Sequence, residues 1–236
     1  MRVIGTAGVE CFKGSCDPWV LTHNCHNCPI RPMKVYQGNG NSFSDRQICQ
    51  DNGFGVLISP GGCRAPHNFP YYAVDNGAFS AWVNEKEWNP DPFLNLLELS
   101  QKSTRPPDMV VVPDKVASGR ESLDFSLNWI KQLPEIGTRY YLAVQDGMEI
   151  SDIIPVIELF GGLFVGGTLE WKYETAPDWV ELAHDHRKPC HIGRIGTWDR
   201  IVWASRIGAD SIDSSSWAQN KSYHHLKNAK MQEVLT

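Results

Sequence analysis

A repeated unit of a short apolar strand followed by an amphipathic helix runs along this chain from about residue 54 onward, and it constrains the fold more than any other feature. Each strand candidate is short, apolar and bounded by Gly, Pro or Asp, as strands buried in a parallel sheet are. The candidates are 56–59, 71–74, 109–112, 139–144, 163–165, 190–192 and 209–212. Because helical segments alternate with these strands, the pattern predicts an α/β protein with a parallel sheet.

Residues 3–7 offer a further apolar segment, which as an eighth strand would close the sheet into a TIM-type (β/α)8 barrel. We predict this barrel as one domain spanning 1–236, since 236 residues suit a single large domain with a buried core. A doubly wound open sheet has the same periodicity and stays as the alternative. Helix starts are expected at Ser122, Ser151, Thr175 and Thr197, which are residue types that cap or open a first turn.

Polar residues and glycines stand at the C-terminal ends of five strand candidates. Asp75 follows one strand in V-D-N-G-A-F, and Asp213 lies in D-S-I-D-S-S-S. Between them come Asp114 after V-V-V-P, Gln145 after Y-L-A-V, and the glycine-rich run 161–167. The C-terminal ends of barrel strands meet at one rim, where barrel enzymes keep their chemistry. The sequence therefore predicts a carboxylate-rich site at that rim.

The overall charge and hydropathy of the chain limit its partners. A formal net charge of -5 gives no general attraction to nucleic acid, so any polynucleotide contact has to come from a local basic patch. No apolar run reaches the length that spans a bilayer, and the first residues lack the layout of a signal peptide. We expect a soluble, cytoplasmic protein that makes no membrane contact.

Five of the seven cysteines fall in the first fifty residues, and they define a Cys-rich N-terminal appendage at 9–52. In a reducing cytoplasm such clustering favours a metal site over disulfides. Cys25 and Cys28 have C-x-x-C spacing, and Cys11 and Cys16 are further ligands for a tetrahedral zinc ion. Reduced thiols without a metal are the alternative, because free Cys often packs as a small hydrophobe.

Six short motifs follow one another along the chain. They are D-N-G-A-F at 75–79, V-V-P-D at 111–114, A-V-Q-D-G at 143–147, G-G-L-F-V-G-G at 161–167, H-I-G-R-I-G-T at 191–197 and D-S-I-D at 210–213. In this order they resemble the tRNA-guanine transglycosylase superfamily, and most closely its short phage branch, the DNA-guanine transglycosylases that place 7-deazaguanines in DNA. The resemblance spans roughly residues 55–217 and implies a pentosyltransferase.

The resemblance implies catalytic roles for two carboxylates. Asp213 matches the family's nucleophile, which holds the strand as a covalent glycosyl-enzyme while one base leaves and another enters. Asp75 matches the general acid/base that protonates the departing guanine, and the chemistry itself requires no cofactor. For either residue alone, a helix N-cap or a loop hydrogen bond is the structural alternative.

The resemblance also implies how guanine would be recognised at its polar edge. Asp114 matches the carboxylate that accepts hydrogen bonds from the N1 and N2 edge of the base. Gln145 and the backbone N–H of Gly162, which follows Gly161, match the donors to O6. Capping of a turn is the alternative for Gln145.

Phe79 matches the family's stacking aromatic, and Ile192 sits where the opposite wall of the base slot would lie. For both residues a place in the hydrophobic core is equally consistent with the sequence. Lys172 and Arg194 lie inside the motifs and are the expected contacts to the nucleic-acid backbone, with a solvated surface charge as the alternative. Because a stacked guanine is inaccessible, the DNA substrate would be a single strand or a duplex with the base flipped out.

Two departures from the family pattern bear on the substrate. Gly167 stands where the bacterial tRNA enzymes carry a Glu that contacts an aminomethyl group, so a neutral base, 7-cyano-7-deazaguanine, is expected unless Glu170 takes that place. No Cys follows Asp213, so the zinc module of the tRNA enzymes is missing and DNA is favoured over tRNA. A tRNA-guanine transglycosylase, an enzyme acting on free nucleosides and a non-catalytic binder remain as alternatives.

Overall fold

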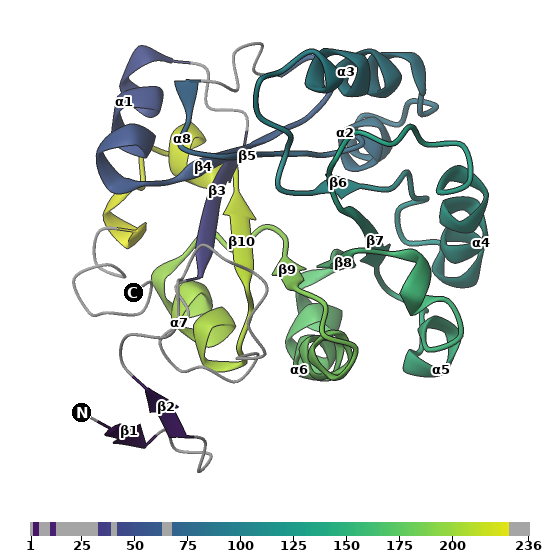
Figure 1. Ribbon diagram of the computed structural model, residues 1–236. Helices are drawn as coiled ribbons and strands as arrows, with labels where there is room; N and C mark the ends of the chain where they lie inside the picture. Colours follow the sequence, from purple (N-terminus) through teal and green to yellow (C-terminus); the bar gives the residue numbers. More distant parts are fainter. Residues whose placement is uncertain (1, 5–9, 13–32, 39–41, 63–67, 227–236) are drawn as a thin grey trace.

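The computed structural model describes residues 2–4, 10–12, 33–38, 42–62 and 68–226. Within them eight parallel strands close into a barrel in the order β10-β3-β4-β5-β6-β7-β8-β9. Figure 1 shows the helices placed around these strands. The strands are β3 (Lys34–Gly38), β4 (Gly55–Ile58), β5 (Tyr72–Val74), β6 (Val110–Val111), β7 (Tyr140–Val144), β8 (Gly162–Val165), β9 (Cys190–Ile192) and β10 (Ser211–Ser214). The barrel prediction is confirmed, and the open sheet is excluded.

The strand that closes the barrel is not the one predicted. β1 (Arg2–Ile4) pairs antiparallel with β2 (Glu10–Phe12) in a separate two-stranded sheet. β3 closes the barrel instead, between β10 and β4, and α1 (Phe43–Asn52) follows it. The sequence K-V-Y-Q-G was missed because Lys34 and Gln37 interrupt its apolar character. β3 and α1, both within the predicted appendage at 9–52, therefore belong to the barrel.

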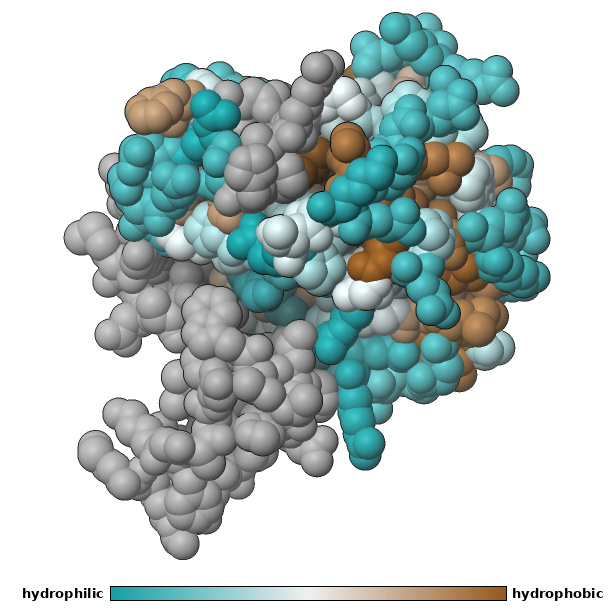
Figure 2. Space-filling view, turned by 45° about the horizontal axis from the view of Figure 1, so that its top comes forward, coloured by the Kyte–Doolittle hydropathy of each residue, from teal (hydrophilic) through white to brown (hydrophobic). Residues whose placement is uncertain are grey.

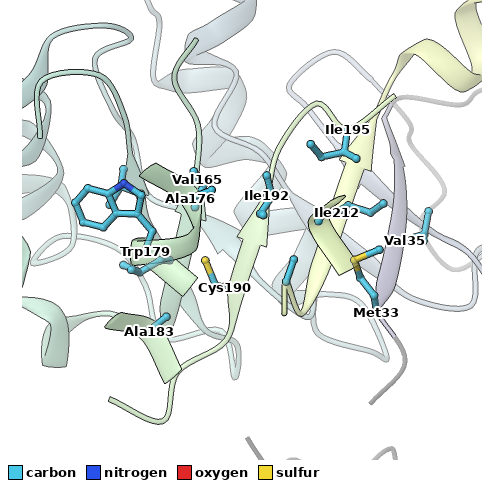
Figure 3. Close-up of a cluster of buried hydrophobic side chains, with 14 of the residues drawn as sticks. Met33, Val35, Val165, Ala176, Trp179, Ala183, Cys190, Ile192, Ile195 and Ile212 are labelled. Carbon is cyan, nitrogen blue, oxygen red and sulfur yellow. The ribbon is translucent and has the colours of Figure 1, made fainter. Parts of the chain in front are cut away.

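The side chains of the barrel strands alternate between two environments. Those that point into the barrel form one cluster, which contains Tyr36, Leu57, Tyr71, Ala73, Met109 and Tyr141. Their neighbours in the strands point outward and pack against the helices in a second, larger cluster, part of which is drawn in Figure 3. Because side chains in a strand alternate with a period of two, a shift of one residue decides whether a side chain can reach the barrel interior.

The helices that follow the strands are α2 (Ala78–Val83), α3 (Asp91–Gln101), α4 (Gly119–Trp129), α5 (Ile150–Ile153), the 3-10 helix η2 (Ile157–Leu159), α6 (Leu169–Asp185), α7 (Trp198–Arg206) and α8 (Ser216–Gln219). Thr197 is the N-cap of α7, as predicted. The other three predicted starts, Ser122, Ser151 and Thr175, lie inside helices whose N-caps are Ser118, Glu149 and Thr168. Ser122 does not cap a helix; its hydroxyl accepts a hydrogen bond from Gln145.

The surface carries hydrophobic residues on several helices. Figure 2 shows them interrupting the polar surface on the half of the visible face that carries α2 to α5. The most exposed large hydrophobic residues between the start of α2 and the end of η2 are Trp82, Val83, Leu99, Ile154 and Leu159. Among the helices in the described ranges, none combines the length and the apolar character needed to cross a membrane.

Candidate active site

A cavity of about 440 Å³ opens at the C-terminal ends of the barrel strands, and we call it the rim cavity. Its size lies in the usual range for small-molecule sites, about 300–1,000 Å³. The lining includes the ends of at least six strands and contains Ser59, Asp75, Phe79, Asp114, Gln145, Asp146, Phe164, Gly166, Gly167, Arg194 and Asp213. The structure therefore brings Asp75, Asp114, Gln145, Phe79, Arg194 and Asp213, all expected at a site, to one place.

Asp75 follows β5 directly and is held by the end of the neighbouring strand. The Ser59 hydroxyl donates to its Oδ2 at 2.9 Å, and the Gly77 N–H donates to the same oxygen at 3.3 Å. The pKa of Asp75 is raised to about 6, mainly by burial; the negative charges of Asp114 and Asp213 act in the same direction, and the hydrogen bond from Ser59 opposes them. A carboxyl with a pKa near neutrality can both give and take a proton under physiological conditions.

Asp114 follows β6 and is fixed through both carboxylate oxygens. Asn76 Nδ2 donates to Oδ1 at 2.7 Å, and Gln145 Nε2 donates to Oδ2 at 3.0 Å. Burial raises the pKa of Asp114 to about 6, although these two bonds favour its ionised form. The orientation of this carboxylate is thus set before any ligand binds.

Gln145 is buried beneath Asp114 at the end of β7, with an exposed fraction of 2%. Its Oε1 accepts the Ala117 N–H at 2.7 Å. Its Nε2 lies within hydrogen-bond distance of Asp114, of the Lys115 carbonyl at 3.0 Å and of the Ser122 hydroxyl at 2.7 Å. Since a primary amide has two N–H protons, these protein acceptors already engage both. In this arrangement Gln145 orients Asp114 rather than offering a donor to a base.

Asp213 lies in β10 and points into the barrel beside His191 of β9. Its Oδ1 accepts hydrogen bonds from His191 Nε2 at 3.0 Å and from the Arg194 N–H at 3.3 Å. Burial lowers the pKa of His191, so the ring is neutral at neutral pH even though Asp213 opposes this shift. The other ring nitrogen, Nδ1, lies 2.8 Å from the Ser211 hydroxyl, which is its donor when Nε2 carries the proton.

His191 was missed by the sequence analysis, although it stands inside one of the motifs. The residue assigned to the base slot was its neighbour Ile192, which is fully buried in the core between the barrel and the helices (Figure 3). That assignment is wrong, because β9 alternates and only His191 faces inward. The ring of Phe164 stacks on His191 with a centroid separation of 4.6 Å, and Phe164 lines the rim cavity.

The glycine pair assigned to base recognition lies at the wrong end of β8. Gly162 is the first residue of the strand and Gly161 precedes it, and a Cβ at Gly162 would stand 2.6 Å from the Tyr141 ring, in the barrel interior. The second pair of the motif, Gly166 and Gly167, follows the strand and lines the rim cavity. The motif has glycine pairs at both ends, and its sequence alone does not tell which pair reaches the rim.

Lys172 was expected to contact a nucleic-acid backbone, and the structure contradicts this. Its side chain, on α6, has an exposed fraction of 0%, and its Nζ donates to the Gly193 carbonyl at 2.5 Å. Burial lowers the pKa of Lys172 to about 7, with the charge of Arg194 acting in the same direction. Lys172 supports the turn after β9 from behind.

The structure describes only one of the four cysteines proposed as zinc ligands. Cys16, Cys25 and Cys28 lie outside the described residues, and Cys11 lies in β2. Among the residues that the structure does describe, no group of three or more His, Cys, Asp or Glu side chains is arranged to hold a metal ion. Zinc binding by the N-terminal segment stays a prediction.

Comparison with known proteins adds no relative, because no protein-family model and no curated protein matches the chain. The fold and the site together define a (β/α)8 barrel with a carboxylate-rich cavity at its C-terminal rim. Such a cavity holds a fixed carboxylate that could act as a nucleophile, a carboxyl that can carry a proton, and a second fixed carboxylate that can accept hydrogen bonds from N–H donors of a ligand.

Proposed function

We propose that this protein is a base-exchange transglycosylase that replaces guanine in DNA with a 7-deazaguanine. The observation that carries the proposal is the convergence of Asp75, Asp114 and Asp213 on one barrel rim, each with different partners. The sequence motifs support the same function through their resemblance to guanine transglycosylases. The DNA would present the target as a single strand or with the base flipped out of the duplex.

Asp213 acts as the nucleophile in this proposal. His191 and the Arg194 N–H fix its Oδ1. A carboxylate oxygen of Asp213 forms a bond to C1′ of the nucleotide while the bond from C1′ to N9 of guanine breaks, and the electron pair leaves with the base. The product of this step is a covalent aspartyl-glycosyl intermediate that keeps the strand attached.

Asp75 carries the proton in both halves of the reaction. With a pKa of about 6 it is partly protonated near neutral pH and gives its proton to the departing guanine. The resulting carboxylate then takes a proton from the incoming base, whose ring nitrogen attacks C1′ and releases Asp213. Two displacements at C1′ retain the configuration of the sugar, as in retaining glycosidases.

Asp114 recognises the base by accepting hydrogen bonds from its N1 and N2 edge, with Asn76 and Gln145 holding the carboxylate in place. The neutral 7-cyano-7-deazaguanine is the proposed incoming base. Gly167 adds no side chain to the rim cavity, and the neighbouring carboxylate of Asp146 already accepts the N–H and the hydroxyl of Thr168 at 2.8 and 2.6 Å. The carboxylate nearest Gly167 is therefore oriented by Thr168, and this arrangement supports the neutral base in the proposal.

The test is to incubate the protein separately with guanine-containing DNA, with tRNA and with free guanine nucleosides, each with 7-cyano-7-deazaguanine, and to analyse the nucleosides by mass spectrometry. Modified deoxynucleoside from DNA alone is the expected result. Product from tRNA alone would move the protein to the tRNA branch, and product from free nucleosides would remove the polynucleotide from the proposal. Asp213→Asn is expected to abolish both exchange and covalent trapping of the strand, and Asp75→Asn to leave little turnover.

A further inference from the structure

The side chain of Arg194 occupies part of the rim cavity itself. Its guanidinium carbon lies 4.4 Å from the centroid of the Phe79 ring, and its Nη2 donates to the Gly167 carbonyl. Phe79, Gly167 and Arg194 all line the cavity. One face of the aromatic ring is therefore covered by a residue of the protein.

The guanidinium makes the kinds of contact that a guanine would make. Both groups are planar, both stack on aromatic faces, and both offer N–H donors along one edge. A purine stacked on the same face of Phe79 would take the volume that Arg194 now fills. The two arrangements exclude each other, so the guanidinium has to leave before a base can stack there.

The backbone of Arg194 is anchored, whereas its side chain is long and rotatable. Arg194 has a φ of 61°, in the left-handed region, and its N–H donates to Asp213. The preceding carbonyl, that of Gly193, accepts the bond from Lys172. Movement of the side chain alone leaves both of these bonds intact, so Arg194 can leave Phe79 without disturbing the nucleophile.

A displaced Arg194 guanidinium would still need an anionic partner. Burial lowers the pKa of Arg194, while the charges of Asp213 and Asp146 act in the opposite direction and favour its ionised form, so a guanidinium that moves away gives up the attraction of two carboxylates. A nucleic-acid strand that delivers a base to this cavity brings phosphates to its rim, and arginine binds phosphate through paired N–H donors.

The geometry points to Arg194 as a residue with two positions: it covers the stacking face of Phe79 in the free protein, and it moves to a strand phosphate when a base enters. This inference rests on the proposed function and adds to it a coupling of base binding to strand binding. A free base alone has to displace Arg194 without compensation. A base attached to a strand supplies the phosphate that receives it.

The test compares Arg194→Ala and Arg194→Lys with a matched control, Arg206→Ala, an exposed arginine at the far end of α7. Calorimetry with free guanine and no DNA should show tighter binding to Arg194→Ala by about three- to tenfold, because the competing cation–π contact is gone. Anisotropy with a labelled single-stranded oligonucleotide should show binding weakened by about tenfold, with a salt slope smaller by about one ion. Arg194→Lys should keep most of the strand affinity, and Arg206→Ala should match the wild type in both assays.

Two negative results have different meanings. If wild-type protein binds guanine and Arg194→Ala binds it equally or more weakly, Arg194 does not compete for the base and the inference is wrong, while the proposed function stands. If the wild type binds neither guanine nor the oligonucleotide, the proposed function fails and the inference fails with it. Circular dichroism of each variant establishes that it is folded before either comparison is made.

Discussion

The Nε2 atom of His191 lies 3.0 Å from Oδ1 of Asp213, across the pairing of β9 with β10. The two residues come from adjacent strands and face the barrel interior together. Because burial favours the neutral ring, the His191 N–H donates to the carboxylate without neutralising it by full proton transfer. The contact fixes the orientation of the proposed nucleophile.

His191→Ala should therefore lower the rate of covalent trapping by about 100-fold, the effect of a misplaced reacting group. The loss should fall on kcat, with KM for the base changed little, because Asp114 and Phe79 are untouched. His191→Gln, which keeps an N–H donor, should recover part of the rate. Single-turnover trapping measures this, with His186→Ala, a histidine bonded to Glu158 at the end of α6, as the control. A folded His191→Ala protein with wild-type kcat would contradict the positioning role.

Much of the site could be predicted from the sequence, because a polar residue directly after a buried parallel strand lies at the C-terminal edge of the sheet. Asp75, Asp114 and Gln145 each end an apolar run, and in a parallel barrel all such ends meet at one rim. Asp213 was placed by its motif and its position near the last strand. The structure brings these residues to one cavity as expected.

The remaining errors arose where the sequence gives no direction. Ile192 and His191 differ by one position, and the choice of which faces inward depends on the register of β9 with its neighbours. The glycine motif has a pair at each end, and only the strand bounds tell that Gly166 and Gly167 follow it. Lys172 read as a surface cation because nothing in its sequence shows that α6 packs this side chain against the turn after β9.

Asp75→Asn should stabilise the protein at neutral pH even though it removes the proposed acid. The pKa of Asp75 in the folded state, about 6, lies above the usual 3.8, so its favourable contribution to folding is complete only below pH 3.8 and is lost as the pH rises through 6. This difference in pKa between the unfolded and folded states predicts a gain of about 2 to 3 kcal/mol for the Asn variant at pH 7.5 and about half of that at pH 5.

Urea unfolding at both pH values measures this gain. Glu98→Gln is a suitable control, because Lys102 lowers the pKa of Glu98 and its substitution should give no stabilisation. Equal stability of Asp75→Asn and wild type at pH 7.5 would show that the carboxyl is not desolvated in the way the structure indicates.

The rate of covalent trapping should have a bell-shaped pH dependence centred near pH 6. Asp75 has to be protonated to assist departure of guanine, whereas Asp114 has to be ionised to accept its N–H donors, and burial raises both pKa values to about 6. Because these two carboxyls interact, the apparent pKa values of the acid limb and the alkaline limb describe the pair and not either residue alone. Asp114→Asn should remove the acid limb and weaken guanine binding, and rates measured from pH 4.5 to 8 in the two proteins check this. If the acid limb persists in Asp114→Asn, that limb arises from the ionisation of another group.

Lys172→Met should separate stability from activity. The pKa of Lys172, about 7, lies below its usual 10.5, so burial of the charge destabilises the fold below pH 7 and this cost disappears as the pH rises toward 10.5. The variant should gain about 3 kcal/mol at pH 6 after the lost bond to Gly193 is counted, and the gain should shrink by pH 9. The salt dependence of oligonucleotide binding should not change, since this lysine is buried; a smaller slope would place it on the strand after all.

Substitution by Ala should affect guanine binding at Gly166 and the stability of the fold at Gly167. A Cβ at Gly166 would lie no nearer than 3.4 Å to the Val144 carbonyl, so Gly166→Ala should fold normally, and its methyl group at the rim cavity should weaken guanine binding. Gly167 has a φ of 71°, and its Cβ would stand 2.5 Å from Oδ2 of Asp146 and 2.7 Å from the Trp171 ring. Gly167→Ala should therefore lose about 2 kcal/mol of stability.

Gly162→Ala completes this comparison, because the Cβ there would overlap the Tyr141 ring at the far end of β8. It should destabilise the fold without changing the affinity for guanine in the protein that remains folded. Thermal unfolding and calorimetry with guanine distinguish the three variants. Weakened guanine binding by Gly162→Ala together with wild-type binding by Gly166→Ala would return base recognition to the first glycine pair. Because any side chain at Gly167 is strained, Gly167→Glu would alter the site through the contacts of its Cβ as well as through its charge. A changed base preference in that variant would therefore not isolate the effect of the charge.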